Sequence, residues 1–275
     1  MPSLVGSEMC IRDRDSTVDL ALLEHCVRED LGSKARRAMA VVHPLKVVLQ
    51  NWPEDRAEEL EMENHPDHPE WGTHKVVLTR EIYIEQEDFM EVPVKKYFRM
   101  FPGNEVRLKG AYIVRCDGCE KDEDGHVTAV LCTVDMDTRN GTEGANRKVK
   151  GTLHWVSASE NIPFEARLYE PLMMKETEEE TAAEAAQSEA EAKAEADGEE
   201  TVVSSATLKT DFLKKLNPNS LEVCHGYLSK ALGEANVGDT YQFLRVGYFC
   251  KDQDSTPDLP VFNRVVGLKD TFAKQ

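Results

Sequence analysis

The chain has 275 residues, of which 40% are hydrophobic, so it can bury one large core or two small ones. It is therefore not a small disulfide scaffold. The formal net charge of −18 argues on average against a nucleic-acid partner, because Lys and Arg supply the contacts to phosphate.

The negative charge is concentrated in two segments. Residues 176–200 have a net charge of −10 and residues 54–70 a net charge of −7, so the rest of the chain is almost neutral. Residues 95–115, by contrast, contain six Lys or Arg residues and the single acid Glu105. A local basic surface is therefore compatible with the acidic average.

Seven cysteines, an odd number, occur without a signal-peptide pattern or an apolar run long enough to span a membrane. Such a chain is typical of a reducing compartment, where cysteines remain thiols. We therefore expect a cytoplasmic protein without disulfides. Residues 1–14 show neither a helical nor a strand period, and we expect them to be an unstructured artefact.

The first expected element is a helix at residues 16–31, within a helical connection over residues 15–36. Ser16 is the expected N-cap, and Asp19 takes the reciprocal position of a capping box. Gly32 is the expected end of the helix, because glycine commonly follows the last helical residue.

Residues 38–49 have the β-branched density of a strand, in which Pro44 predicts an edge or a kink. Residues 51–73 are polar and proline-rich, so we expect a long surface loop there. A metal site is the alternative interpretation of this region. It would use three histidines, namely His65, His68 and His74. Without an acidic partner at fixed spacing, they favour the ordinary loop.

From residue 75 onward, apolar residues recur with a period of two, which is typical of strands. Turn clusters such as residues 102–104 separate these runs, and residues 115–126 resemble a hairpin connection. Short strands at this spacing predict a mainly β fold, either a sandwich or a barrel. The expected strands are residues 76–78, 82–84, 106–115, 127–134, 149–156, 221–225, 241–249 and 261–266.

Residues 174–206 form a low-complexity segment, rich in Ala and Glu, without a large apolar residue before Val202. It cannot contribute to a core, so we interpret it as an acidic insertion. It separates a first β region, residues 37–173, from a second, residues 207–275. The second region is small enough to need packing against the first.

Cys116 and Cys119 have the spacing of half a zinc knuckle, which Cys132, His126 or His154 could complete. No second pair with this spacing follows, and Cys116 falls on the apolar phase of its strand. We therefore favour ordinary thiols and no metal. The sequence contains no Gly-rich phosphate loop, nucleophile elbow or HEXXH motif, and so no candidate catalytic residues.

Residues 95–112 combine cations with aromatic rings. Arg107 and Lys109 lie two positions apart on an expected strand, so their side chains should share a face about 6.6 Å apart, a spacing that suits adjacent phosphates. Rings that could stack on unpaired bases alternate with further cations. These residues are Lys95, Lys96, Tyr97, Phe98, Arg99 and Phe101. The pattern leaves two interpretations open: an RNA-binding surface, or a solvated strand face over core aromatics.

Seven segments between residues 15 and 274 resemble, in the same order, the C-terminal part of bacterial glutaminyl-tRNA synthetases. The segments are LEHCVREDL (23–31), RRAMAVVHPLKVV (36–48), NHPDHPEWG (64–72), KVKGTLHWVSA (148–158), ARLYEPL (166–172), YQFLRVGYFC (241–250) and VFNRVVGLKDTFAK (261–274). The resemblance implies two packed β-barrels of the ribosomal protein L25 type that bind the anticodon. It also implies that residues 37–93 interleave with the C-terminal strands.

The resemblance further assigns roles to single residues. Arg37 and Gln242 match readers of the middle anticodon base, Arg99 matches a reader of the third base, and Arg107 matches a residue that holds the first. Arg245 matches a further contact position. Lys96 and Lys109 also belong to the anticodon-binding set, in which we expect them to contact phosphates. Lys95, Phe98 and Thr271 are expected to have phosphate or auxiliary roles.

The chain departs from the well-known enterobacterial pattern at five positions. It has Lys96 in place of Gln, Phe98 in place of Lys, Lys109 in place of Arg, Asp67 in place of Asn and Leu244 in place of Glu. Lysine keeps the charge but lacks the guanidinium fork, so contacts at Lys109 should be geometrically less strict. The acidic insertion exceeds the expected linker, which predicts a position away from the RNA-binding face.

The HIGH-like and KMSKS-like ATP-binding motifs of the family are missing from this sequence. The resemblance therefore implies that a full-length enzyme uses ATP, magnesium and L-glutamine, whereas this fragment binds tRNA(Gln), as a monomer, and is inactive alone. The second hypothesis is a stand-alone ribosomal RNA-binding protein of the L25 type, which shares the barrel architecture.

Overall fold

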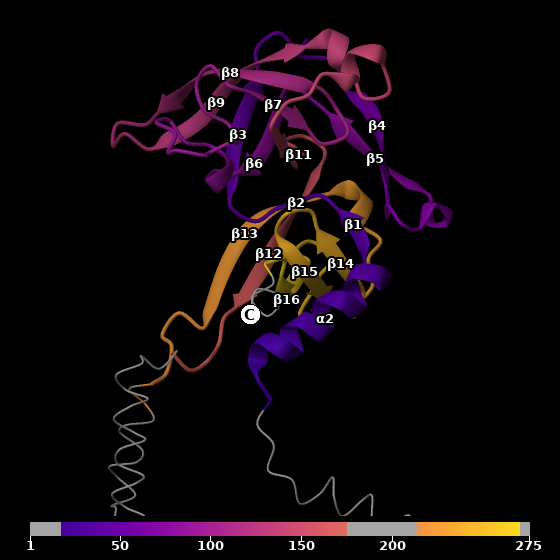
Figure 1. Ribbon diagram of the computed structural model, residues 1–275, viewed down its shortest axis with the longest axis vertical. Coiled ribbons are helices and arrows are strands. Elements are labelled where there is room, and N and C mark those ends of the chain that lie inside the picture. Colours follow the sequence, from indigo (N-terminus) through magenta and orange to yellow (C-terminus); the bar gives the residue numbers. More distant parts are fainter. Residues whose placement is uncertain (1–17, 175–212, 214, 270–275) are drawn as a thin grey trace, which may run out of the picture. The chain divides into compact units, whose positions relative to one another are not determined.

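The computed structural model describes residues 18–174, 213 and 215–269, and it is mainly β (Figure 1). Most strands belong to two barrel-like, seven-stranded sheets, which confirms the predicted fold class. The contacts divide the chain into two compact units, Met1–Ala166 with Cys224–Gln275, and Arg167–Val223. Within the described residues, no helix is both long and apolar enough to cross a membrane.

The first sheet, which we call the terminal sheet, combines strands from both ends of the chain. Its order is β1 (Arg36–Ala38), β14 (Thr240–Phe243), β15 (Gly247–Lys251), β16 (Val261–Gly267), β12 (Asn161–Tyr169), β13 (Leu221–Ser229) and β2 (Ala40–Val41). Strands from residues 36–41 therefore lie in the same sheet as strands from residues 221–267. Strand β12, which the period analysis missed, belongs to this sheet and not with the strands at residues 44–157.

The second sheet, the central sheet, is built from residues 44–157. Its order is β10 (Gly151–Leu153), β7 (Glu105–Leu108), β8 (Ile113–Lys121), β9 (Val127–Asp135), β3 (Pro44–Leu49), β6 (Glu81–Glu85) and β11 (Val156–Ser157). A separate hairpin consists of β4 (Glu58–Glu63) and β5 (Thr73–Leu78). Strand β3 begins at Pro44, after a break at residues 42–43, so the predicted interruption is confirmed.

Aromatic rings fill both cores. In the terminal sheet, Phe243 stacks on Phe249 with ring centroids 4.3 Å apart, and Phe164 meets Phe243 edge-on at 5.9 Å. In the central sheet, Trp52 packs edge-on against Tyr112 at 5.5 Å. Such ring pairs contribute roughly 1 kcal/mol each beyond the area they bury, so these residues help to fix the shape of each sheet.

The helix α2 (Leu20–Lys34) differs from the prediction at both ends. Asp19 is the N-cap, and its carboxylate accepts the Ala21 N–H at 2.9 Å. The predicted N-cap, Ser16, lies outside the described residues. The prediction that Gly32 ends the helix is wrong. The helix continues to Lys34, and the backbone becomes extended at Ala35.

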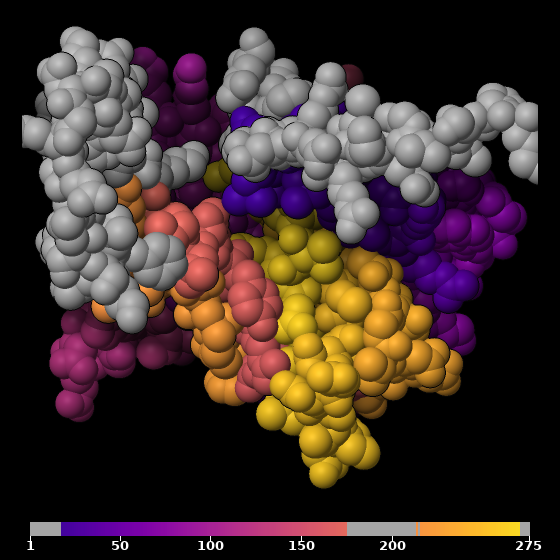
Figure 2. All heavy atoms as spheres, turned by 90° about the horizontal axis from the view of Figure 1, so that it is seen from below, coloured from indigo at the N-terminus to yellow at the C-terminus, as the bar shows by residue number. Residues whose placement is uncertain are grey.

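One face of α2 packs on the terminal sheet. Val27 and Leu31 pack against a cluster of Ala35, Tyr248 and Val266. In Figure 2, the indigo helix lies beside the yellow C-terminal strands. A Cβ at Gly32 would lie 3.5 Å from the Tyr248 hydroxyl, an ordinary van der Waals contact, so Gly32 lies on the face of the helix that packs on the sheet.

The predicted surface loop at residues 51–73 is wrong in its central part. Strand β4 pairs antiparallel with β5, and Leu60 and Met62 on β4 are buried. The intervening positions of β4 carry glutamates, so the alternation is apolar-in and acid-out. The density of acids hid this period in the sequence.

Three other strand boundaries also differ from the predictions. Residues 106–115 form two strands, β7 and β8, joined by a turn in which Gly110 has a φ of 70°. Strand β8 runs to Lys121, so the hairpin connection is residues 122–126 and not 115–126. Residues 241–249 likewise form two strands, β14 and β15, around a turn.

A buried carboxylate fixes the crossing from the terminal sheet to the central sheet. Glu85, which is 5% exposed, accepts the backbone N–H groups of Val42 and His43 at 2.8 and 2.9 Å. His154 Nε2 lies 3.5 Å from the same carboxylate. Burial raises the pKa of Glu85, but His154 and the two N–H donors outweigh it, so the pKa lies below its ordinary value of 4.5.

The smaller unit, Arg167–Val223, contains a paired stem on either side of residues 175–212. The Glu170 N–H donates to the Ser220 carbonyl at 2.9 Å, and the Met174 N–H donates to the Lys215 carbonyl at 2.9 Å. The described segments on either side, residues 170–174 and 215–220, therefore lie side by side, and residues 175–212 lie outside the described part of the chain.

We expect deletion of residues 176–200 to leave folding intact, because the stem that closes this segment is formed by residues outside the deletion. Thermal unfolding followed by circular dichroism should show a cooperative transition close to that of the intact chain. Loss of cooperativity would show that the acidic segment contributes to the core.

We expect Glu85→Gln to lower the free energy of unfolding by about 2 kcal/mol near neutral pH, because an amide oxygen accepts weaker hydrogen bonds than a carboxylate. A lowered folded-state pKa stabilises the fold above the unfolded value of 4.5, and this stabilisation is lost as the pH falls through the folded value. Denaturant titrations should therefore converge for the two proteins at acidic pH.

The matched control is Glu81→Gln on the same strand, whose exposed carboxylate contacts Lys46 at 3.0 Å. It should change stability by less than about 1 kcal/mol. A difference between Glu85→Gln and the intact chain that does not change with pH would contradict the assignment.

Candidate nucleic-acid interface

Arg37 and Gln242 are neighbours on adjacent strands. Strand β1 pairs parallel with β14, and the register places Arg37 opposite Gln242. The Arg37 N–H donates to the Asn64 carbonyl at 2.7 Å, whereas its Nε is buried without a hydrogen-bond partner among the described residues. Burial raises the pKa of the nearby Tyr248. The positive charge of Arg37 lowers this pKa by a smaller amount, so the pKa of Tyr248 stays above its ordinary value. An unpaired buried donor beside an amide side chain suits a polar ligand.

Arg245 lies in the turn between β14 and β15, with a φ of 66° that is unusual for a residue other than glycine. Its two Nη atoms contact the two carboxylate oxygens of Asp88 at 2.6 and 2.7 Å, a bidentate ion pair. Asp88 ends a 3-10 helix (Gln86–Asp88) and is fully buried. The turn is thereby attached to a segment distant in the sequence.

Arg99 contacts the same short helix. Its Nη1 lies 3.2 Å from Asp88 Oδ1 and 2.9 Å from Glu87 Oε1, and it donates to the Glu87 carbonyl at 3.1 Å. Partial burial lowers the pKa of Arg99, but the charges of Asp88 and Glu87 outweigh it and raise the pKa. Burial and the charge of Asp88 raise the pKa of Tyr97 to about 12. Arg99 is therefore always positively charged, and its contacts with Glu87 and Asp88 hold its guanidinium in place.

The segment before Arg99 is exposed. Lys95 and Lys96 are both exposed, and Lys96 has a φ of 70°. Phe98 is 48% exposed, and Lys150 Nζ lies 5.0 Å from its ring centre. The ring is thus outside the core, so the interpretation of Phe98 as a core aromatic is wrong.

Arg107 and Lys109 do not share a strand face as predicted. Arg107 lies on β7, and its Nη2 donates to the carbonyls of Ala145 and Arg147 at 2.7 and 3.1 Å. Lys109 follows the end of β7 in the turn, where its carbonyl accepts the Trp155 Nε1–H at 3.0 Å. Strand β7 ends at Leu108, so the strand on which the 6.6 Å spacing was based does not include Lys109.

The structure joins four of the candidate residues directly: the register pairs Arg37 with Gln242, and Asp88 joins Arg245 to Arg99. A second set surrounds β10. Gly151 on β10 pairs with Val106 beside Arg107, and a Cβ at Gly151 would lie 2.2 Å from the Phe98 carbonyl. Thr271 lies outside the described residues.

The sequence analysis missed Asp88 and Lys150. Asp88 lies in an acidic tripeptide, QED, and nothing in its spacing distinguishes it from a solvated acid. The only local signal is the following apolar pair Phe89 and Met90, which predicts partial burial of the segment. Its two arginine partners come from other segments, so their convergence depends on the tertiary fold.

The histidines of residues 64–74 have structural contacts. His65 is buried, with Nε2 2.9 Å from the Gly32 carbonyl. The His68 ring stacks on Trp71 with centroids 4.5 Å apart. His74 Nδ1 lies 2.8 Å from Asn64 Oδ1, and burial lowers the pKa of His74. Each of the three histidine rings thus contacts another residue of the described chain.

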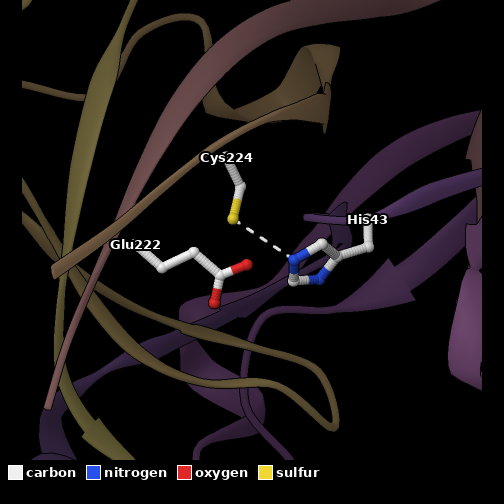
Figure 3. A group of neighbouring side chains, drawn as sticks. All are labelled: His43, Glu222 and Cys224. Atoms are coloured by element: carbon white, nitrogen blue, oxygen red, sulfur yellow. Dashed lines mark hydrogen bonds between the residues drawn. The ribbon is translucent and has the colours of Figure 1, made fainter. Parts of the chain in front are cut away.

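Cys116 lies close to Cys132, and Cys224 lies close to His43. Cys116 and Cys132 are buried opposite each other on β8 and β9. A hydrogen bond to Cys132 lowers the pKa of Cys116, and the same bond together with burial raises that of Cys132. Cys224 lies 3.2 Å from His43 Nε2 (Figure 3).

We expect Lys96→Gly to be more stable than Lys96→Ala by about 1 kcal/mol. Both changes remove the charge, but only glycine adopts a left-handed backbone without the roughly 1–2 kcal/mol penalty of other residues. Denaturant unfolding of the two variants measures the difference. Equal stability would show that the segment relaxes to another conformation at no cost.

Two family models match the chain. Residues 35–135 match the anticodon-binding domain of class I tRNA synthetases (E and Q), and residues 152–252 match a second model with the same description. The two matched ranges include nine of the candidate residues, from Arg37 to Arg245. The matches do not favour the alternative hypothesis of a ribosomal protein.

The chain is also similar to curated glutamine–tRNA ligases. It is 48% identical over 259 residues to that of Clostridium perfringens, covering 94% of this chain and 42% of the relative. For Bradyrhizobium diazoefficiens the identity is 44% over 262 residues, covering 95% and 42%. For Aliivibrio fischeri it is 41% over 264 residues, covering 96% and 43%.

The chain thus spans about two fifths of the length of the curated relatives it matches. Both family models and these relatives agree with the resemblance found in the seven sequence segments. The chain therefore belongs to the class I tRNA synthetases for E and Q, and it carries their anticodon-binding domains.

Proposed function

We propose that this chain recognises the anticodon of tRNA(Gln) as part of a glutamine–tRNA ligase. The observation that carries the proposal is the pairing of Arg37 with Gln242 on adjacent strands, beside a buried Arg37 Nε that has no partner within the described residues. An unsatisfied buried donor is costly, and a base edge could satisfy it.

Arg37 and Gln242 together suit the middle base of the glutamine anticodon, which is uridine. The guanidinium only donates hydrogen bonds, whereas the glutamine amide both donates and accepts. Uridine presents two carbonyl acceptors and one N–H donor on its Watson–Crick edge. One donor-only and one mixed side chain can therefore satisfy all three groups of an unpaired uridine.

The remaining candidates contribute to the other two bases and the backbone. Arg99 reads the third base, and Arg107, held by the carbonyls of residues 145 and 147, fixes the first base. Phe98 offers an exposed ring for stacking. The further cations contact phosphates, with an auxiliary contact from the C-terminus: Lys95, Lys96, Lys109, Arg245 and Thr271.

In the complete ligase, this recognition serves the ATP- and magnesium-dependent attachment of L-glutamine to tRNA(Gln). The proposal rests on the name of the relatives and on the missing ATP-binding motifs in this sequence. We further propose that the protein acts as a monomer in the cytoplasm. By itself this chain would bind tRNA without activating glutamine.

We expect Arg37→Ala and Gln242→Ala each to weaken binding of a tRNA(Gln) transcript by about 1–3 kcal/mol, as for a lost base contact. Discrimination against a transcript with cytidine in the middle position should fall by the same amount. Fluorescence anisotropy with both transcripts measures both quantities. Equal losses on every transcript would contradict base reading by these residues.

Lys95→Ala provides the control, because we expect a phosphate contact at this exposed lysine. It should weaken all transcripts equally and lower the salt dependence of binding by about one unit of slope. A change in base discrimination with Lys95→Ala would mean that the assay reports general affinity and not base reading.

A further inference from the structure

Asp88 is a fully buried carboxylate on which two candidate RNA-binding arginines converge. A buried charge is costly unless it is paired, and here Arg245 supplies a bidentate partner and Arg99 a third contact. Two cations therefore share one buried anion, together with the mostly exposed Glu87. The two positive and two negative charges balance formally, so the cluster offers a ligand hydrogen-bond donors and no excess of positive charge.

The two arginines are held in different ways. Arg245 uses both Nη atoms on Asp88. Arg99 uses only Nη1, which contacts the Glu87 carbonyl, Glu87 Oε1 and Asp88 Oδ1. Within the described residues, the hydrogen bonds and shortest ion-pair contacts of the Arg99 guanidinium all involve Nη1 and not Nε or Nη2. Arg99 is therefore held through Nη1. Its Nε and Nη2 atoms form a second edge with two parallel donors, which a ligand could use.

That edge matches one base in particular. An arginine presents two parallel donors, and guanine presents two adjacent acceptors, O6 and N7. Both glutamine codons begin with cytosine, so the third anticodon base is guanine. The orientation of the Arg99 edge decides whether both hydrogen bonds form, and Asp88 and Glu87 set that orientation.

On this basis, and resting on the proposed function, we infer that Asp88 is a positioning residue for the third anticodon base. Its carboxylate holds Arg99 by Nη1 so that the Nε–Nη2 edge faces O6 and N7 of guanine. Arg245 fixes the carboxylate from the other side and keeps a left-handed backbone that costs roughly 1–2 kcal/mol.

The carboxylate can be tested apart from the fold of its segment, because backbone contacts also hold residues 97–100. The Met100 N–H donates to the Asp88 carbonyl at 2.9 Å, and the Tyr97 hydroxyl donates to the Glu87 carbonyl at 3.1 Å. Asp88→Asn leaves these backbone acceptors and the side-chain shape in place, removes the charge, and replaces one of the two acceptor oxygens by an NH2 donor.

The test compares Asp88→Asn with the intact chain on a tRNA(Gln) transcript and on a transcript with adenosine as the third anticodon base. We expect discrimination between the two transcripts to fall about five- to tenfold, the lower range for a lost base contact. In an Arg99→Ala background, Asp88→Asn should cause no further loss, because its effect acts through Arg99.

Glu58→Gln is the matched control. Glu58 is a largely buried carboxylate that likewise holds two arginines, Arg56 at 2.7 Å and Arg139 at 2.6 Å, and it contacts no candidate base reader. It should lower stability in the same way as Asp88→Asn but leave third-base discrimination unchanged. This comparison separates positioning of Arg99 from a general loss of stability.

The outcomes distinguish this inference from the proposed function. If Arg99→Ala lowers discrimination but Asp88→Asn does not, or weakens all transcripts equally, the positioning role is overturned. If Arg99→Ala itself leaves third-base discrimination unchanged, the base assignment under the proposed function fails. If Asp88→Asn does not unfold cooperatively, the double variant Asp88→Asn with Arg245→Gln replaces it. This variant removes the charges of both residues, and the same comparison with the same outcomes applies.

Discussion

The parallel pairing of β1 with β14 is the contact on which the candidate interface depends. It places Arg37 beside Gln242 and brings the start of the described chain to its C-terminal strands. A parallel pair requires a long crossover, and here the whole central sheet lies within that crossover. The pairing therefore fixes the terminal sheet and also determines where the inserted central sheet begins and ends.

Buried carboxylates connect segments that this topology separates. Glu85 binds the backbone where the chain crosses from one sheet to the other, and Asp88, three residues later, binds Arg99 and Arg245. Each acid is buried with ionic or N–H partners, which offset the cost of removing its charge from water. An acidic protein can thus hold its basic residues in place for an anionic ligand.

Much of the fold was predictable where the apolar period was clear. The helix, the interruption at Pro44 and the alternating strands after residue 75 follow from local pattern. The errors have local causes: acids at alternate positions hid β4, and Gly110 ended β7 inside an apparently continuous strand. In the candidate site, the resemblance brought Arg37 and Gln242 together, whereas the acidic partner of Arg99 and Arg245 had no signature in the sequence.

The sequence by itself determined the β class, the family and the cationic stretch at residues 95–112, because composition, period and motif order are local properties. Only the tertiary structure decided that Phe98 is exposed, that Arg107 and Lys109 lie on different elements, and that Asp88 holds two arginines. Burial and ion pairing depend on which distant segments meet, and the pairing register of the strands fixes those meetings.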